Sequence, residues 1–76
     1  MSLISADKMD VHQEVEVREI EESEVSLKLL EMGILPGKRL ILLHIAPLGD
    51  PMAFQVDDAV IALRKDEAQF VKVETI

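Results

Sequence analysis

The sequence contains no cysteine, tryptophan or tyrosine, and its only aromatic residues are Phe54 and Phe70. Without cysteine there are no disulfide bonds, thiolate nucleophiles or cysteine-bound metal centres, which suits a reducing compartment. Two aromatic rings are too few for a platform on which nucleic-acid bases stack. The net charge of −7 also opposes the phosphate contacts on which nucleic-acid binding depends. We therefore expect no nucleic-acid partner.

Long apolar runs are also missing. No stretch approaches the roughly 20 apolar residues that cross a bilayer, and the start "MSLISADK" lacks the basic residues and apolar centre of a signal peptide. We expect a cytoplasmic protein that inserts no segment into a membrane. Its 76 residues, of which 49% are hydrophobic and 30% charged, fit one globular domain, residues 1–76, with a single small core.

The acidic residues are concentrated in the first third of the chain. Residues 1–24 contain eight acidic and two basic residues, whereas residues 25–76 contain seven and six. A charge run of this kind usually forms a solvated face. We therefore assign this third no partner on its charge alone.

A first strand is predicted over residues 13–22, "QEVEVREIEE". Val15 and Val17 alternate with polar residues, and the apolar pattern then skips to Ile20, as it does at a β-bulge or a strand end. A helix is predicted next, over residues 23–33, "SEVSLKLLEMG". Its apolar positions have helical spacing, and the wider apolar face is formed by Val25, Leu27, Leu29, Leu30 and Met32.

The ends of this helix carry their own signals. Ser23 is a candidate N-cap, and Glu24 is expected in the first turn, where a negative charge favours the helix dipole. Gly33 is suited to the left-handed position that follows a helix. The next residues, "LPGK", place Pro36 and Gly37 at the two central positions of a type II turn.

The second half of the chain reads as strands and short turns. The run "KRLILLHIA", residues 38–46, is apolar on both faces and is predicted to be a central strand covered on both sides. Residues 51–58 and 59–65 form a hairpin with "DD" as its turn, "KDEA" forms a single helical turn, and residues 69–75 form the last strand. Residues 1 to about 10 are expected to be a loose lead or a short helical turn at "SADKM".

Five short strands in so few residues favour closure, because an open sheet would leave long unpaired edges. The predicted fold is therefore mainly β: a small five-stranded SH3-like barrel with one short helix after the first strand, which plugs one end.

Three segments, "KLLEMGILPGKRL", "APLGDPMAFQV" and "IALRKDEAQFVKV", resemble in order and spacing the ferrous-iron transport protein A (FeoA) family. The resemblance covers residues 27–76. It does not extend to the family's proline-glycine turn before the first strand, because "MDVHQEV" has neither residue. It implies an SH3-like cytosolic protein without enzymatic activity that assists the transporter FeoB in Fe(II) uptake by docking on its cytosolic part. Similar SH3-like domains occur at the end of some metal-dependent repressors of the diphtheria-toxin-repressor type.

The residues themselves offer little for catalysis or metal binding. No nucleophile turn or phosphate-binding glycine loop is present, and the serines all lie in the N-terminal third. His12 and His44 have no partner at a recognised ligand spacing, and we expect His44 to be a packed or partly exposed strand residue. We therefore expect no enzyme, no cofactor and no tight metal site, with weak binding of divalent ions as the exception.

A binding surface is the function that the turns favour. The helix end and the loop "APLGDP" are both stiffened by proline, so a partner would meet a preformed site. The candidate contact residues, on the hypothesis that the two turns lie together, are Met32, Leu35, Leu48 and Met52. The candidate structural turn residues are Gly33, Pro36, Gly37, Pro47, Gly49, Asp50 and Pro51. A strand edge that accepts another chain, including a second copy, is the other option.

Two functional hypotheses follow. The first is an accessory regulator of ferrous iron uptake that docks on a FeoB-type transporter. The second is a stand-alone SH3-like regulatory module, related to the C-terminal domain of metal-dependent repressors, that binds a metal or a peptide.

Overall fold

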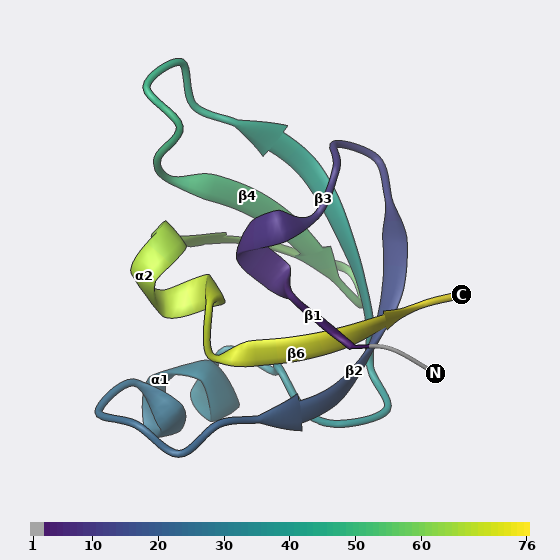
Figure 1. Ribbon diagram of the computed structural model, residues 1–76, viewed down its shortest axis with the longest axis vertical. Coiled ribbons are helices and arrows are strands. Elements are labelled where there is room, and N and C mark those ends of the chain that lie inside the picture. The colour runs from purple at the N-terminus through teal and green to yellow at the C-terminus, as the bar shows by residue number, and fades with distance from the viewer. Residues whose placement is uncertain (1–2) are drawn as a thin grey trace.

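The computed structural model describes residues 3–76, which form one curled antiparallel sheet with short helices at its open side (Figure 1). The sheet contains six strands in the order β1-β6-β2-β3-β4-β5. In chain order the elements are β1 (Ile4–Ser5), the 3-10 turn η1 (Ala6–Lys8), β2 (Glu14–Ile20), α1 (Ser26–Glu31), β3 (Arg39–Ile45), β4 (Met52–Val56), β5 (Ala59–Leu63), α2 (Lys65–Ala68) and β6 (Val71–Thr75).

The predicted mainly-β class is confirmed, and the number of strands rises from five to six. The additional strand is β1, which pairs Ile4 with Val73 of β6. The predicted helical turn near the N-terminus is η1, and Ala6 within it is fully buried, so these residues are not a loose lead. The sheet curls until η1 lies against α2, which brings its two edges toward each other.

The core fills the inside of the curl. Alternating residues of a strand point inward, as Val15 and Val17 of β2 do, and both of these valines are fully buried. The predicted break in this alternation is present, because the pairing of β2 with β6 shifts register between Val17 and Glu19. The largest fully buried side chains are Phe54, Leu29, Ile34, Leu40, Leu42, Met52 and Leu63.

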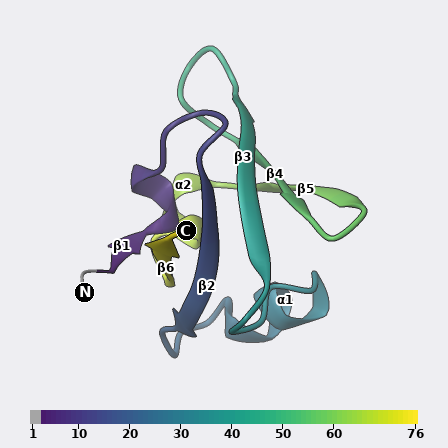
Figure 2. The ribbon, with the colours of Figure 1, turned by 90° about the vertical axis from the view of Figure 1, so that its right-hand side faces the viewer.

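The central strand β3 is covered on one face only. Leu40 and Leu42 are fully buried, but the opposite face of the strand, with Ile41 and Leu43, is half-buried and His44 is exposed. The prediction of a strand covered on both sides was therefore wrong. Within residues 3–76 the helices are short, and none of them lies over the outer face of β3 (Figure 2).

The helix α1 begins three residues later than predicted. Val25 precedes the first helical residue, and Ser23 is not its cap. The Ser23 hydroxyl accepts a hydrogen bond from the backbone N–H of Val25 at 3.3 Å, and the Ser26 hydroxyl accepts one from the N–H of Ser23 at 2.8 Å. Two serine side chains thus hold a turn that delays the helix, and Glu24 falls before its first turn.

The end of α1 is the predicted glycine cap. Gly33 has a φ of +91°. Its N–H donates to the carbonyl of Leu30 at 3.0 Å, and the N–H of Ile34 donates to the carbonyl of Leu29 at 3.0 Å. This pair of bonds is a Schellman motif, in which Ile34 enters the core beside the helix. The "LPGK" turn follows, with Gly37 at φ +95° and the N–H of Lys38 donating to the Leu35 carbonyl at 3.1 Å.

Candidate interaction surface

The two proline-glycine turns lie at opposite ends of β3, so they do not form the single contact surface that the sequence predicted from them. In Figures 1 and 2 the loop of residues 46–51 is at the top of the molecule and α1 is at the bottom. A strand of seven residues separates them, which spans about 20 Å. Met52 is also fully buried, so it is a core residue and not a contact residue. The reason is strand alternation, which turns Met52 inward together with Phe54.

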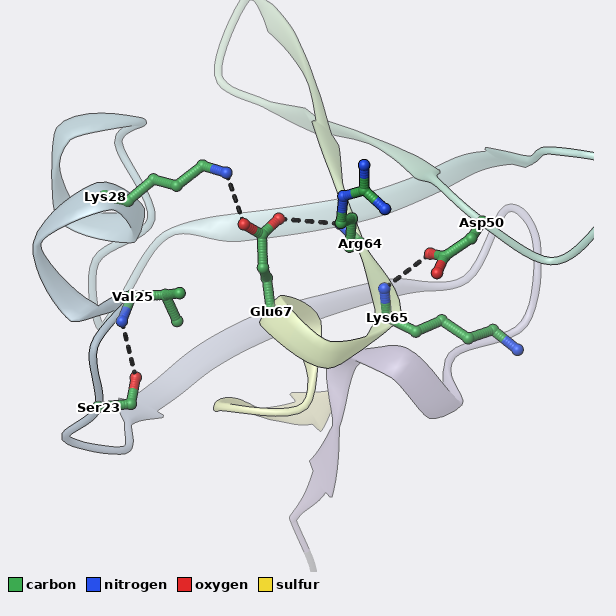
Figure 3. Close-up of polar contacts among 7 residues, drawn as sticks. All are labelled: Ser23, Val25, Lys28, Asp50, Arg64, Lys65 and Glu67. Carbon is green, nitrogen blue, oxygen red and sulfur yellow. Dashed lines mark hydrogen bonds and ion pairs between the residues drawn. The ribbon is translucent and has the colours of Figure 1, made fainter.

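The loop of residues 46–51 presents one apolar side chain on a braced backbone. Leu48, between Pro47 and Gly49, is 97% exposed, the highest value among the large hydrophobic residues of the described chain. The N–H of Gly49 donates to the Ala46 carbonyl at 2.7 Å, and the N–H of Ala46 donates to the Pro51 carbonyl at 3.0 Å. The Asp50 carboxylate accepts a hydrogen bond from the N–H of Lys65 at 2.8 Å, which ties the loop to α2 (Figure 3).

The opposite end of the molecule presents a second apolar patch. Leu35, beside Pro36, is 38% exposed, whereas Met32 packs partly against the core. Leu27 and Leu30 on the outer side of α1 are 66% and 50% exposed. The helical spacing had predicted both on the apolar, core-facing side of the helix. A six-residue helix presents only one side to the core, and Leu29 occupies it.

The helix α2 contacts both ends of the domain: Lys65 bonds to Asp50 of the loop, and Glu67 bonds to Lys28 of α1. The Glu67 carboxylate accepts hydrogen bonds from the Lys28 ammonium and from the backbone N–H of Arg64 at 3.0 Å (Figure 3). These donors, the Lys28 ammonium first, hold the pKa of Glu67 below its usual value. The surrounding open hollow has a volume of about 370 Å³ and is lined by Lys28, Asp50, Pro51, Ala62, Arg64 and Glu67. Its two carboxylates already accept hydrogen bonds from backbone and lysine donors, which gives them a structural role.

The candidate metal ligands do not come together. Within residues 3–76 the structure holds no group of three histidine, aspartate or glutamate side chains with the geometry to bind an ion. His12 is exposed in a turn with a φ of +73°, and His44 is exposed on β3. None of the helices described in residues 3–76 is long and apolar enough to cross a membrane.

The curled sheet and its covering helices define a small SH3-like domain. Stenotrophomonas maltophilia FeoA, which is described as a procaryotic SH3 domain protein complexed with zinc, has this fold: the TM-score is 0.84 at 24% identity, covering 93% of this chain and 89% of that one. The FeoA domain family model matches residues 4–75, and the chain therefore belongs to the FeoA family.

Individual relatives extend this comparison. A FeoA-like protein from Clostridium acetobutylicum superposes with a TM-score of 0.94 at 32% identity, covering 100% of this chain and 90% of that one. The chain is 37% identical over 49 residues to an Fe(2+) transport protein A/Fe(2+) transporter FeoB fusion protein from Porphyromonas gingivalis; this is 64% of this chain and only 6% of that protein. A manganese-dependent transcriptional repressor shares the fold at 17% identity, with a TM-score of 0.88 over 97% of this chain and 42% of that one.

Proposed function

We propose that this chain is a non-enzymatic, cytoplasmic accessory protein of ferrous iron uptake that docks on the cytosolic part of a FeoB-type transporter. The observation that carries the proposal is the Porphyromonas gingivalis relative, in which protein A and transporter FeoB are one fusion protein. A covalent link holds two domains at high effective concentration, which benefits domains that act on each other. When the same domain is a separate chain, docking has to supply that proximity.

Leu48 is the docking element that the surface favours. A fully exposed leucine recovers about 1.5–3 kcal/mol when a partner buries it. Its loop is braced by the hydrogen bonds of Gly49, Ala46 and Asp50, so little conformational entropy is lost on binding. Leu35 and the α1 leucines, Leu27 and Leu30, form the rival patch at the opposite end of the domain.

The test is calorimetry of this protein with the purified cytosolic part of a FeoB-type transporter. We expect Leu48→Asp to weaken binding at least tenfold, which corresponds to about 1.4 kcal/mol. Leu27→Asp is the matched control, because it places the same charge on another exposed leucine, at the far end of the domain. Unchanged binding by Leu48→Asp, or a loss confined to Leu27→Asp, would show that the Leu48 loop is not the docking surface.

The shared fold with a metal-dependent repressor supports the second candidate, an SH3-like regulatory module that binds a metal or a peptide. It stands behind the first, because the family membership and the fusion relative both point to iron transport. Anaerobic calorimetry with Fe(II) separates the two. We expect weak binding of divalent ions only, and a sub-micromolar dissociation constant would favour the regulatory module.

A further inference from the structure

The strand β5 is an unprotected edge of the sheet. It pairs with β4 on one side and, within residues 3–76, has no strand on the other. Proteins usually protect such edges with charged side chains, proline, bulges or very short strands. The other edge of this sheet follows that rule, because β1 has two residues. β5 has five residues, "AVIAL", without charge or proline, and Val60 on it is 64% exposed.

The hydrogen-bonding groups on the free side of β5 follow from the hairpin. Residues 57 and 58 form a two-residue turn between Val56 and Ala59, and Asp57 has the positive φ, +54°, of the first central residue in a mirror-image hairpin turn. The residues that flank such a turn exchange both hydrogen bonds, and bonded pairs then alternate along the ladder. Val60 and Ala62 therefore point their N–H and C=O groups away from β4.

The charges around β5 form a self-complementary pattern. Asp57 and Asp58 precede the strand, and Arg64 and Lys65 follow it, so residues 57–65 read "DDAVIALRK". In an antiparallel pair of two copies centred on Ile61, Val60 faces Ala62 and Asp58 faces Arg64. Val60 then lies opposite the smaller Ala62, Ile61 faces Ile61 of the other copy, and each acid lies opposite a base.

The bases in this pattern are also the ones that the domain itself leaves unpaired. Among residues 3–76, six of the eight lysines and arginines form ion pairs with carboxylates, and the two that do not are Arg64 and Lys65. Asp58 is likewise exposed and has no ion pair within that range. The fold thus leaves unused the acid and the base that an antiparallel partner would bring together.

We infer that two copies of this chain associate through their β5 edges in a symmetric antiparallel dimer. Val60 and Ala62 of each copy exchange backbone hydrogen bonds with Ala62 and Val60 of the other, and Asp58 pairs with Arg64 at both ends of the joint. Such a contact is isologous, so it closes at two copies. Figure 2 shows the β4–β5 hairpin projecting from the body of the domain, where a second copy has access to it.

The dimer is expected to be weak. One five-residue edge buries far less than the roughly 800 Å² per partner of a standard interface, so the dissociation constant should lie between about 10 µM and 1 mM. Because exposed ion pairs contribute to it, association should weaken as the salt concentration rises. Sedimentation of the full chain between about 10 µM and 1 mM measures both effects.

Charge reversal provides the decisive experiment. Arg64→Glu places a second acid opposite Asp58, and Asp58→Lys places a second base opposite Arg64, so each variant alone should dimerise at least about tenfold more weakly. An equimolar mixture should recover association as a heterodimer. The lysine introduced in one copy then faces the glutamate introduced in the other, while the original Asp58 and Arg64 face each other at the second end of the joint. The mixture also has the same total charge as the wild type.

The control for net charge is Lys8→Glu, since Lys8 is remote from β5 in sequence and its side chain is 72% exposed. It changes the charge of the protein by the same amount as Arg64→Glu but leaves the β5 edge intact. We expect it to weaken the dimer much less than Arg64→Glu does.

Two further measurements locate the contact. Ala62→Pro removes an N–H that points outward, so the domain should fold, as circular dichroism would show, but should no longer dimerise. The amide protons of Val60 and Ala62 should exchange more slowly as the protein concentration rises. The inference would be overturned if the wild type stays monomeric or if the mixture associates no better than its components. It would also be overturned if Lys8→Glu weakens the dimer as much as Arg64→Glu does, or if a folded Ala62→Pro variant still dimerises.

Discussion

Replacing Glu67 with glutamine tests whether α2 holds α1 against the sheet. The side chain of Glu67 is 13% exposed, and that of its partner, Lys28, is 52% exposed. The contribution of such a pair to stability should lie between that of an exposed ion pair, about 0.2–1 kcal/mol, and that of a charged hydrogen bond, about 1.5–3 kcal/mol. We expect Glu67→Gln to lower the free energy of unfolding by about 1 kcal/mol at pH 7, which lowers the melting temperature by about 4–8 °C.

The pH dependence of this loss follows from the pKa of Glu67. The folded state lowers this pKa from its ordinary value of 4.5, so the charged carboxylate stabilises the fold above pH 4.5. As the pH falls through the lowered pKa, the carboxylate is protonated in both states and the contribution is lost. The difference between the wild type and Glu67→Gln should therefore be full at pH 7 and should shrink progressively below pH 4.5.

Thermal unfolding followed by circular dichroism between pH 7 and acid pH measures this difference. Glu19→Gln is the control, because it removes the same charge from an exposed residue that has no ion pair within residues 3–76. We expect it to change the melting temperature little at any pH. An equal loss for both variants, or a loss for Glu67→Gln that does not change with pH, would refute the assigned role of the Lys28–Glu67 contact.

Two other substitutions test the turns and the core. Gly37→Ala should lower the free energy of unfolding in urea by about 1–2 kcal/mol, because residue 37 has a φ of +95°. The added methyl group meets no atom within 4 Å beyond the chain neighbours, so the cost comes from the backbone alone, and a neutral result would contradict this strain. Met52→Ala should cost about 2–5 kcal/mol, because Met52 is fully buried, and it should leave partner binding unchanged at temperatures where the variant is folded. Weaker binding by a variant of unchanged stability would instead place Met52 on the surface.

The strands and turns were largely predictable, because one-sided burial leaves a visible pattern. Val15 and Val17 alternate in β2, and Val71 and Val73 alternate in β6, and all four are fully buried. The bulge after Val17 was visible as a break in that alternation. Gly33 and Gly37 were predictable because both positions require a positive φ.

The candidate surface was not predictable, because it depends on distances between segments. The sequence shows that two rigid turns flank β3, but not that a straight strand keeps them at opposite ends of the domain. The start of α1 depended on which backbone N–H groups the two serine hydroxyls bind, since Ser26 accepts from the N–H of Ser23 and Ser23 accepts from the N–H of Val25. The pairing of β1 with β6 joins Ile4 to Val73, and no local pattern near Ile4 reports a contact so distant in sequence.

The proposed docking loop and the proposed dimer edge are neighbours, yet they use different groups. Asp50 connects the loop to the backbone of Lys65, next to the end of β5. Pairing through β5 uses Val60, Ala62 and Arg64, and Leu48 is not among the residues that it pairs. Ile61 is the centre of the paired edge and Arg64 follows it by about three residues, or about 10 Å of strand. The two Arg64 residues of a dimer, one on each side of the centre, would therefore be about 20 Å apart. A dimer would therefore present two Leu48 loops at opposite ends of one joined edge, and substitutions at Leu48 and at Arg64 should affect docking and self-association independently.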